Sequence, residues 1–282
     1  MLTKSRELAV RVAERVAYDV PRLYRTVGLR ASLKYGARAA LNAPAVARRG
    51  SLAPVDFAMA ETLPLRFHGV TINIPVAAMD AATSGFDPTP TFGGVREMFV
   101  QDCYLRGFTS LPVGGTVLDL GANRGMFDLI ALKVLKADHV IAVEPNVGFA
   151  PVGELLLKAN GIESDAVTRR NGYAAPAGSE FADAPTVTMT ELSSGVPGGR
   201  FSFCKMDIEG GEFALAAERH LLEMCDTIAA EVHPFGGSVD HLVSQFREAG
   251  FEVSLGDRFG RACPMELAEY LYASRVPGRV KG

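Results

Sequence analysis

Two short segments of the chain carry residue types that suit the binding of a nucleoside. Residues 121–125 read Gly-Ala-Asn-Arg-Gly and follow an apolar run at 116–120. Glycine tolerates positive φ and lacks a Cβ, so such a turn lets a ligand approach the backbone. Glu144 ends a second apolar run at 139–143, and its carboxylate can accept hydrogen bonds from both hydroxyls of a ribose. Gly121 and Glu144 lie 23 residues apart, near the ~20 residues expected between a glycine turn and a ribose-binding acid.

The motifs that the sequence lacks restrict the kind of nucleoside that could bind. The turn has no middle glycine, so it does not match the Gly-x-Gly-x-x-Gly turn that holds a pyrophosphate, which disfavours NAD. The chain also contains no Gly-x-x-x-x-Gly-Lys-Ser/Thr loop, which excludes the usual ATPases and GTPases. A cationic nucleoside without phosphates remains. The alternative is an ordinary βαβ unit with a turn glycine and a solvated glutamate.

A second string, residues 203–213, reads Phe-Cys-Lys-Met-Asp-Ile-Glu-Gly-Gly-Glu-Phe. An apolar strand here delivers one basic and three acidic residues to the carboxyl edge, where ligands of open α/β sheets bind. They are Lys205, Asp207, Glu209 and Glu212, and His233 follows the next predicted strand at 227–232. The segment therefore predicts the reactive part of the site.

These side chains suggest catalytic roles. Asp207 at the strand end would face a cofactor or an acceptor, and His233 is the natural general base because the usual pKa of histidine lies near neutrality. Lys205 alternates in phase with Asp207, so it could neutralise that carboxylate or donate to a substrate oxygen. The alternative for Lys205, Glu209 and Glu212 is a structural ion-pair network at the start of the following helix.

The same strand ends could also hold a metal ion. Asp207, Glu209, Glu231 and His233 offer three carboxylates and one imidazole, a set suited to Mg²⁺ or another hard divalent cation. Strand alternation does not fix how side chains point beyond a strand end. We therefore predict a site without a metal and keep Asp207, Glu231 and His233 as possible ligands.

The motifs together resemble a known enzyme family. Asp119-x-Gly121-x-x-x-Gly125 resembles the first motif of class I methyltransferases that use S-adenosylmethionine. With the string from Lys205 to Glu212 and Ala-Glu-Val-His at 230–233, the chain closely resembles the FkbM family of methyltransferases over roughly residues 95–275. One departure is Gly211, where the family often has alanine. The resemblance implies S-adenosylmethionine as the cofactor, O-methylation of a hydroxyl on a sugar or secondary metabolite, and cofactor contacts from Asp119, Gly121, Asn123, Gly125, Glu144, Asn171 and Asp207.

The order of predicted elements gives the fold class. After a long loop predicted at 77–94 and a helix at 95–105, the sequence predicts strands at 116–120, 139–143, 166–170, 201–206 and 227–232 and helices at 149–159, 211–222 and 239–249. This alternation implies an α/β fold whose parallel sheet is covered on both faces. Two consecutive strands at 251–255 and 269–274 allow an antiparallel edge. The family resemblance implies a Rossmann-like class I methyltransferase fold, with a mostly parallel seven-stranded sheet, an antiparallel edge strand and a helical N-terminal extension.

Charge separates the N-terminal segment from the rest of the chain. Residues 1–50 contain eleven basic and three acidic residues, a net charge of +8, which leaves −11 for the remainder of a chain with net charge −3. We therefore predict a basic helical arm at 1–50, a hairpin and lid-like loop at 51–94, and the S-adenosylmethionine-binding domain at 95–282. In the arm, Pro21 is expected to close a first helix, and 27–41 to form a second. The first helix presents Leu8, Val12 and Val16 on one face, with Arg11 and Arg15 beside them.

The arm has two interpretations. It could meet an anionic surface such as lipid headgroups, nucleic acid or a phosphorylated substrate. It could equally be a helical lid or a dimerisation arm, through which the chain would form a homo-oligomer. A small hydroxylated substrate is the expected partner. Nucleic acid is not expected, because residues 206–209 read Met-Asp-Ile-Glu where base methyltransferases have Asn/Asp-Pro-Pro-Tyr/Phe, and the arm has few aromatics beyond Tyr18, Tyr24 and Tyr35.

Composition fits a globular protein, with 48% hydrophobic and 22% charged residues. The four cysteines lack metal-binding spacing, so buried reduced thiols are expected at Cys103, Cys204, Cys225 and Cys263. No apolar run of 18 residues and no signal peptide is present, so we expect no membrane span and a cytoplasmic location. The competing hypotheses are an RNA methyltransferase that uses the basic arm and a noncatalytic binding protein on the same fold.

Overall fold

The computed structural model describes the backbone of residues 2–59 and 61–282, and the side chains of 14, 16–46, 48–59 and 61–282. The chain divides into two compact units. One is formed by the chain up to Asp102 and by Glu154–Gly161, and the other by Cys103–Gly153 and Ile162–Gly282. We describe each unit by itself.

The first unit begins with α1 (Leu2–Arg49), which breaks at Gly28, where φ is 78° and ψ is 174°. The prediction that Pro21 ends the first helix is wrong, because Pro21 and also Pro44 lie inside α1. Proline costs a helix one hydrogen bond, but its φ fits the helix, whereas only glycine adopts positive φ readily. The predicted apolar stripe falls mostly on side chains outside the described ones, those of Leu8, Val12, Arg11 and Arg15.

The predicted hairpin is confirmed. Strands β1 (Thr62–Phe67) and β2 (Val70–Pro75) pair in antiparallel fashion. Between them His68 and Gly69 both have positive φ, 43° and 80°, as in the two-residue turn that matches the twist of a hairpin. Alternate residues of β1 are buried, so one face of the hairpin contributes to the core of this unit.

The segment predicted as a long loop, 77–94, contains helices instead. Besides α2 (Ala53–Asp56), the unit has α3 (Val76–Thr83) and α4 (Thr91–Val95). The loop prediction relied on missing periodicity, but α3 is rich in alanine, the best helix former, and Asp80 Oδ1 accepts from the Thr91 amide at 2.8 Å. The helix predicted at 95–105 is only the π-helical turn η1 (Arg96–Val100), because Asp102 takes a φ of 54°.

A buried ionic cluster ties α1 to η1 within this unit. Arg96 contacts Asp19 Oδ2 at 3.4 Å and Asp56 Oδ2 at 3.2 Å, and Gln101 donates to Asp19 Oδ1 at 2.9 Å. All four side chains are buried. Burial acts to lower the pKa of Arg96, but the carboxylates of Asp56 and Asp19 outweigh it and raise that pKa above its usual value.

We expect Arg96→Met to lower the free energy of unfolding by about 3–5 kcal/mol, because it leaves two buried carboxylates without their cation. Urea unfolding measures the loss. Arg66→Met is the matched control, since Arg66 is exposed on β1, and it should change stability by less than ~0.5 kcal/mol. Equal stability of the two variants would show that Arg96 does not hold α1 in place.

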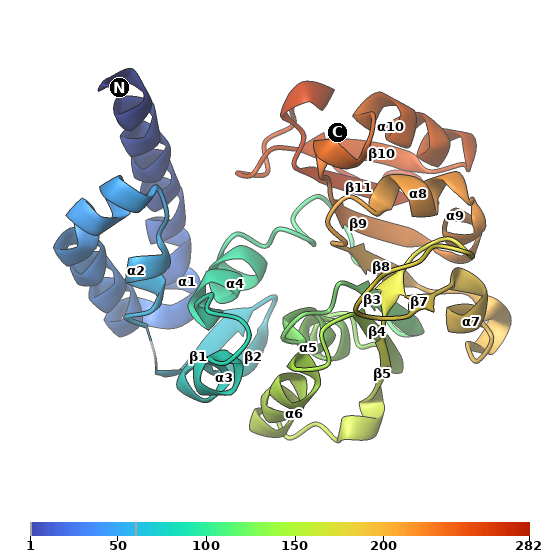
Figure 1. The fold of residues 1–282 in the computed structure, drawn as a ribbon, viewed down its shortest axis with the longest axis horizontal. Coiled ribbons are helices and arrows are strands. Elements are labelled where there is room, and N and C mark those ends of the chain that lie inside the picture. The colour runs from blue at the N-terminus through green and yellow to red at the C-terminus, as the bar shows by residue number, and fades with distance from the viewer. Residues whose placement is uncertain (1, 60) are drawn as a thin grey trace. The chain divides into compact units, whose positions relative to one another are not determined.

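The second unit contains a seven-stranded sheet in the order β10-β11-β9-β8-β3-β4-β5 (Figure 1). All neighbours pair in parallel except β11, which is antiparallel to β9 and β10. The strands are β3 (Thr116–Leu120), β4 (His139–Glu144), β5 (Val167–Asn171), β8 (Phe203–Met206), β9 (Thr227–Glu231), β10 (Glu252–Gly256) and β11 (Tyr270–Ser274). The predicted α/β class with a mostly parallel sheet is confirmed.

The antiparallel strand differs from the prediction in its position. It was expected at the edge, but β11 lies one place inside, and β10 forms the edge. Every residue of β11 is buried, whereas β10 begins with the exposed Glu252 and is only partly covered. An apolar strand is stabilised by neighbours on both sides, and a partly polar strand tolerates the edge.

Helices and short turns connect these strands. The helices are α5 (Met126–Lys133), α6 (Phe149–Ala159), α7 (Met189–Ser193), α8 (Glu212–Ala217), α9 (His220–Met224) and α10 (Val239–Glu248). The other elements are η2 (Ser164–Ala166), β6 (Tyr173–Ala174), β7 (Thr186–Val187), η3 (Pro197–Gly199), η4 (Pro234–Gly236) and η5 (Met265–Leu267). The single helix predicted at 211–222 splits into α8 and α9 because Arg219 has a φ of 62°. Helix α5 packs on β3 and β4, and α10 packs on β10.

The residues of β3 and β8 are buried throughout, as expected for central strands covered on both faces. Three of the cysteines, Cys103, Cys204 and Cys225, are buried thiols as predicted. Among the described residues, no helix is both long and apolar enough to cross a membrane.

The sheet register brings the predicted site residues to one edge. Leu120 is level with Val143 on β4 and with Met206 on β8, and Met206 is level with Ala230 on β9. These strands are parallel, so the residues that follow lie at their shared carboxyl edge. They include Gly121, Glu144, Asp207 and Glu231.

Candidate functional site

The glycine turn after β3 is shaped by the protein that packs behind it. Gly121, Asn123 and Gly125 have positive φ, of 74°, 47° and 76°. A Cβ on Gly121 would lie 1.8 Å from the carbonyl oxygen of Asp207, and one on Gly125 would lie 2.9 Å from the Arg169 guanidinium and the Asp128 carboxylate. The sequence suggested that the glycines admit a ligand, but the structure shows that they admit neighbouring protein atoms.

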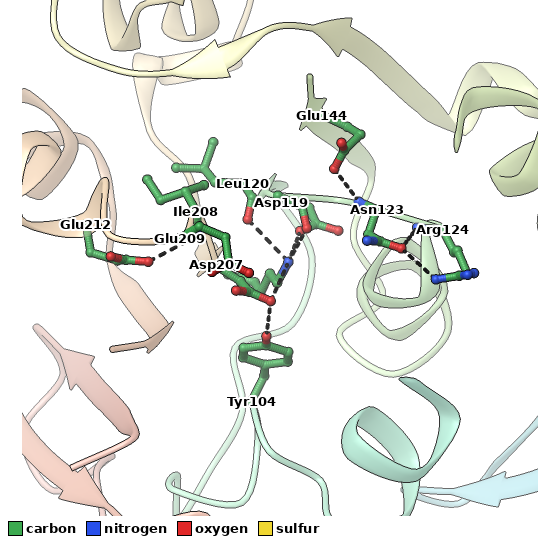
Figure 2. A network of polar contacts seen from close by, with 12 residues as sticks. Tyr104, Asp119, Leu120, Asn123, Arg124, Glu144, Asp207, Ile208, Glu209 and Glu212 are labelled. Carbon is green, nitrogen blue, oxygen red and sulfur yellow. Dashed lines mark hydrogen bonds and ion pairs between the residues drawn. The ribbon is translucent and has the colours of Figure 1, made fainter. Parts of the chain in front are cut away.

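Glu144 lies at the end of β4 beside this turn. Its Oε2 accepts from the Asn123 amide at 2.8 Å (Figure 2), and its Oε1 accepts from the Asn146 amide at 2.9 Å. Burial raises the pKa of Glu144, against the two backbone hydrogen bonds that lower it. Each carboxylate oxygen has two lone pairs, so each keeps one acceptor position for a ligand hydroxyl.

A cavity of about 440 Å³ opens on this side of the turn. Of the predicted cofactor residues, it is lined by Gly121, Asn123, Glu144 and Asp207. The others lie behind the lining. Asp119 is fully buried, Gly125 packs on the Asp128–Arg169 pair, and Asn171 donates to the carbonyls of Glu144 and Pro145 at 3.1 and 2.6 Å. Asn171 therefore holds the end of β4 rather than lining the cavity.

Aromatic residues that the sequence reasoning missed line the same cavity. Tyr173 and Phe181 stack with ring centroids 4.2 Å apart and an interplanar angle of 24°. They belong to the Gly/Ala/Pro-rich segment after β5, whose lack of periodicity gave no signal for them. The Tyr173 hydroxyl contacts the Asp183 carboxylate at 3.1 Å, which fixes the ring at this wall.

Lys205 lies beneath the turn. Its Nζ donates to the carbonyls of Leu120 at 3.2 Å and Gly121 at 2.5 Å, and contacts Asp119 Oδ1 at 3.1 Å. The lysine and Asp119 have no exposed side-chain surface. Burial acts to lower the pKa of Lys205, but Asp119 and then Asp207 outweigh it and raise that pKa. Lys205 is thus a charged residue that fastens the turn, and it does not line the cavity.

A second buried pair supports this network from α5. Asp128 accepts from the Arg169 guanidinium at 2.7 Å and has no exposed side-chain surface. Burial, followed by the charge of Asp119, raises the pKa of Asp128 to about 8, against the lowering effect of Arg169. The pKa of Asp128 therefore lies above that of an ordinary aspartate even though Arg169 pairs with it. An aspartate in the apolar run 126–132 was the signal that could have found it.

Asp207 is held by its neighbours and faces the cavity. Its Oδ2 accepts from the Tyr104 hydroxyl at 2.9 Å (Figure 2) and lies 4.0 Å from Lys205 Nζ. Burial, and then the charge of Asp207, raises the pKa of Tyr104 well above its usual value, so the phenol stays a donor. Tyr104 was not predicted, and nothing in its sequence surroundings distinguishes it.

His233, at the end of the strand after β8, is paired with Glu212. Its Nδ1 lies 2.9 Å from Glu212 Oε1, which also accepts from the Ile208 amide at 3.2 Å, and its Nε2 lies 3.6 Å from Glu209 Oε2. The hydrogen bond with Glu212 raises the pKa of His233 to about 9, against the lowering effect of burial. The pKa of His233 therefore lies above the value near neutrality that the sequence analysis assumed for it.

The structure brings together one group of potential metal ligands. Among the described residues, ligand atoms of Asp207, Glu209 and His233 all lie within 4.8 Å of one another. Glu231, which the sequence suggested, is not in this group. Two carboxylates and an imidazole suit a divalent cation, but here the imidazole is already engaged by Glu212 and faces Glu209 as an ion pair.

The strand order and the carboxyl-edge cavity define a class of protein. The sheet ordered 10-11-9-8-3-4-5 with β11 reversed is the mostly parallel, Rossmann-like sheet of an α/β protein with its cavity at the carboxyl edge. Residues 119–253 match the family model of the methyltransferase FkbM domain. This match agrees with the resemblance to FkbM methyltransferases that the motifs predicted, and it covers just under half of the chain.

Comparison with individual proteins gives the following relatives. The chain is 43% identical over 67 residues to the 31-O-demethyl-FK506 methyltransferase FkbM of Streptomyces tacrolimicus, a match that spans 24% of this chain and 24% of that relative. Among solved structures, methyltransferase FkbM from Methylobacillus flagellatus KT is 17% identical to this chain. The structural match covers 70% of this chain and 58% of that protein's chain, with a TM-score of 0.45. A ribosomal protein L11 methylase from Lactobacillus delbrueckii subsp. bulgaricus is 17% identical with coverages of 67% and 82% and a TM-score of 0.41.

Proposed function

We propose that the protein is an S-adenosylmethionine-dependent O-methyltransferase that acts on a hydroxyl of a small metabolite, such as a sugar or a secondary metabolite. Methyltransferases of this family use S-adenosylmethionine in general. The Streptomyces relative is named as a 31-O-demethyl-FK506 methyltransferase, which supports an oxygen acceptor here. A cytoplasmic location is part of the proposal.

The observation that supports the proposal most strongly is that Glu144 lines a cavity whose other walls carry an aromatic pair and a second carboxylate. Glu144 retains an acceptor position on each oxygen, which fits the two hydroxyls of a ribose. The stacked Tyr173 and Phe181 offer an aromatic wall suited to adenine. Asp207 provides a carboxylate on the same cavity, which favours a cationic ligand and disfavours phosphates.

When bound, S-adenosylmethionine supplies a methyl group activated by a positive sulfur. The protein's task is then to orient an acceptor hydroxyl and to remove its proton, since a neutral hydroxyl is a poor nucleophile. In the proposal, the neutral form of His233 accepts this proton at Nε2, and Glu212 orients the ring through Nδ1. Asp207, fixed by Tyr104, positions the acceptor. Lys205 acts as a positioning residue through the turn.

We expect Glu144→Ala to weaken binding of S-adenosylhomocysteine by roughly 10- to 100-fold, because hydrogen bonds to a charged acceptor contribute about 1.5–3 kcal/mol each. Isothermal titration measures this. Glu163→Ala, at an exposed position of the same unit, is the control and should bind as the wild type does. Unchanged affinity of Glu144→Ala would place the ribose elsewhere. Wild-type binding of NADH in place of S-adenosylhomocysteine would contradict the cofactor assignment, and binding of neither would support a noncatalytic protein.

We expect His233→Ala and Asp207→Ala to lower turnover by about 10²–10⁴-fold with affinity for S-adenosylhomocysteine largely retained. The measurement is transfer of a labelled methyl group to hydroxylated metabolites, with and without EDTA. We expect activity to persist in EDTA, because Glu212 and Glu209 already engage His233. Loss of activity in EDTA and recovery in Mg²⁺ would make Asp207, Glu209 and His233 metal ligands instead, and full turnover in both variants would remove them from the mechanism.

A further inference from the structure

The acid-free part of the N-terminal helix exposes apolar and basic side chains together. From Val20 to Val55 the sequence has seven basic residues and no aspartate or glutamate. In the C-terminal part of α1, Leu29, Leu33 and Leu41 are 60%, 64% and 74% exposed. A soluble protein normally buries leucines that repeat on one side of a helix, so this face needs an explanation.

Helical spacing places the exposed leucines, Arg30 and Arg48 within roughly 120° of one another, with Arg38 at the flank of this arc. With 3.6 residues per turn, Leu29 and Leu33 are neighbours, and Leu41 lies on the adjoining strip with Arg30 and Arg48. Arg30, Arg38 and Arg48 are all exposed. The opposite side of the helix carries Tyr35 and Val46, which are 0% and 4% exposed and anchor α1 in the core of its unit. The outward face is therefore a fixed surface, here called the Leu/Arg face (Leu29, Arg30, Leu33, Arg38, Leu41 and Arg48).

We propose that the Leu/Arg face binds an anionic phospholipid surface, with the helix lying in the plane of the headgroups. A helix with leucines and arginines on one side and no acid satisfies both requirements of such a surface, apolar burial at the acyl boundary and attraction to lipid phosphates. Lys34 is set apart from the face by its ion pair with Glu61 at 2.6 Å, so the charge on offer comes from the arginines.

Two other occupants fit these observations less well. A second copy of the chain packed symmetrically on this face would bring the same arginines against one another. Nucleic acid would use the arginines but not the leucines. Of the arm's three tyrosines only Tyr24 is an open ring, at 57% exposed, because Tyr35 is buried and the Tyr18 ring is covered by Arg22, 3.6 Å from its centroid.

The test is flotation of the full-length protein with vesicles of pure phosphatidylcholine or of phosphatidylcholine with phosphatidylserine. We expect binding to the anionic vesicles only, weakening as salt rises. The triple variant R30Q/R38Q/R48Q should lower partitioning by about 100-fold, at roughly fivefold per arginine. The triple variant L29S/L33S/L41S should lower it by at least about 10-fold.

Matched controls separate the Leu/Arg face from general surface properties. V113S/L267S/V276S removes apolar side chains that are 75%, 64% and 42% exposed in the other unit, and R200Q/R219Q/R258Q removes exposed arginines there. Both should float as the wild type does. The proposal is overturned if the protein does not bind anionic vesicles, if it binds neutral vesicles equally well, or if L29S/L33S/L41S binds anionic vesicles as the wild type does. Binding of the protein to RNA in place of vesicles, with the same affinity in L29S/L33S/L41S, would also overturn it. So would a dimer that L29S/L33S/L41S dissociates, if the wild type binds no vesicles.

Discussion

Gly121→Ala is expected to destabilise the protein by about 2–5 kcal/mol, from about 1–2 kcal/mol of backbone strain at positive φ and about 1–3 kcal/mol of overpacking. The new methyl carbon would lie 1.8 Å from the carbonyl oxygen of Asp207. That oxygen belongs to the backbone after β8, so the contact can be relieved only by moving the strand end or the turn. Urea unfolding measures the loss of stability.

The same change should also remove cofactor binding. Moving the end of β8 displaces the Asp207 carboxylate from Tyr104, and moving the turn displaces the Asn123 amide from Glu144. We expect the affinity for S-adenosylhomocysteine to fall by at least about 100-fold, two lost hydrogen bonds to charged groups being sufficient for this.

Gly198→Ala is the matched control for backbone strain. Gly198 has a φ of 71°, close to the 74° of Gly121, but no atom lies within 4 Å of its added Cβ. The substitution should lower the free energy of unfolding by only about 1–2 kcal/mol. The variant should bind S-adenosylhomocysteine as the wild type does. If the two alanine variants were equally stable and bound equally well, the close approach of β8 to the turn would have no role in forming the site.

The second large effect is expected in the pH dependence of turnover. His233 has a pKa of about 9, so the neutral imidazole that accepts the proton is a minor form at pH 7. We therefore expect kcat/KM to rise about tenfold per pH unit below 9 and to level off above it. A flat profile between pH 7 and 9 would show that His233 is not the base.

Glu212→Gln tests the cause of this shift. The hydrogen bond with Glu212 is its largest cause, so removing the charge should move the rise in activity toward the usual histidine value of 6.5. Glu209→Gln is the control, because Glu209 is 81% exposed and its charge is screened by water. It should leave the profile nearly unchanged. A larger shift in Glu209→Gln than in Glu212→Gln would reassign the partner of His233.

Stability should change with pH in the opposite direction to activity. A histidine whose pKa is raised on folding stabilises the folded state fully below the unfolded pKa of 6.5, and this contribution is lost as pH rises through about 9. The buried Asp128 acts in the same sense, since its pKa of about 8 lies above the usual 3.8 and folding then favours the protonated form. Urea unfolding between pH 6 and 9.5 should show declining stability, and Asp128→Asn should reduce the slope below pH 8.

The sequence determined the elements that follow local patterns. Apolar runs, either alternating or continuous, predicted the ends of β3, β4, β5 and β9 to within about one residue of the observed ends. The bounds predicted for α6 are the observed ones. These elements are central or amphipathic, so burial acts on every residue and leaves a clear pattern. Where local propensity was mixed, as in 77–94 and 95–105, the pattern did not predict the backbone, which has a hydrogen bond from the Thr91 amide to Asp80 and a positive φ at Asp102.

The chemistry of the site divides in the same way. The types and spacing of Gly121, Glu144, Asp207 and His233 were enough to predict the family and the edge of the sheet, because parallel strands bring their carboxyl ends together. Only the tertiary structure showed that Asp119, Lys205 and Gly125 lie beneath the turn, that Tyr104 and Glu212 contact Asp207 and His233, and that Glu212 raises the pKa of His233. The physical reason is that burial and charge at such a site come from residues far apart in the chain, whose distances no local pattern encodes.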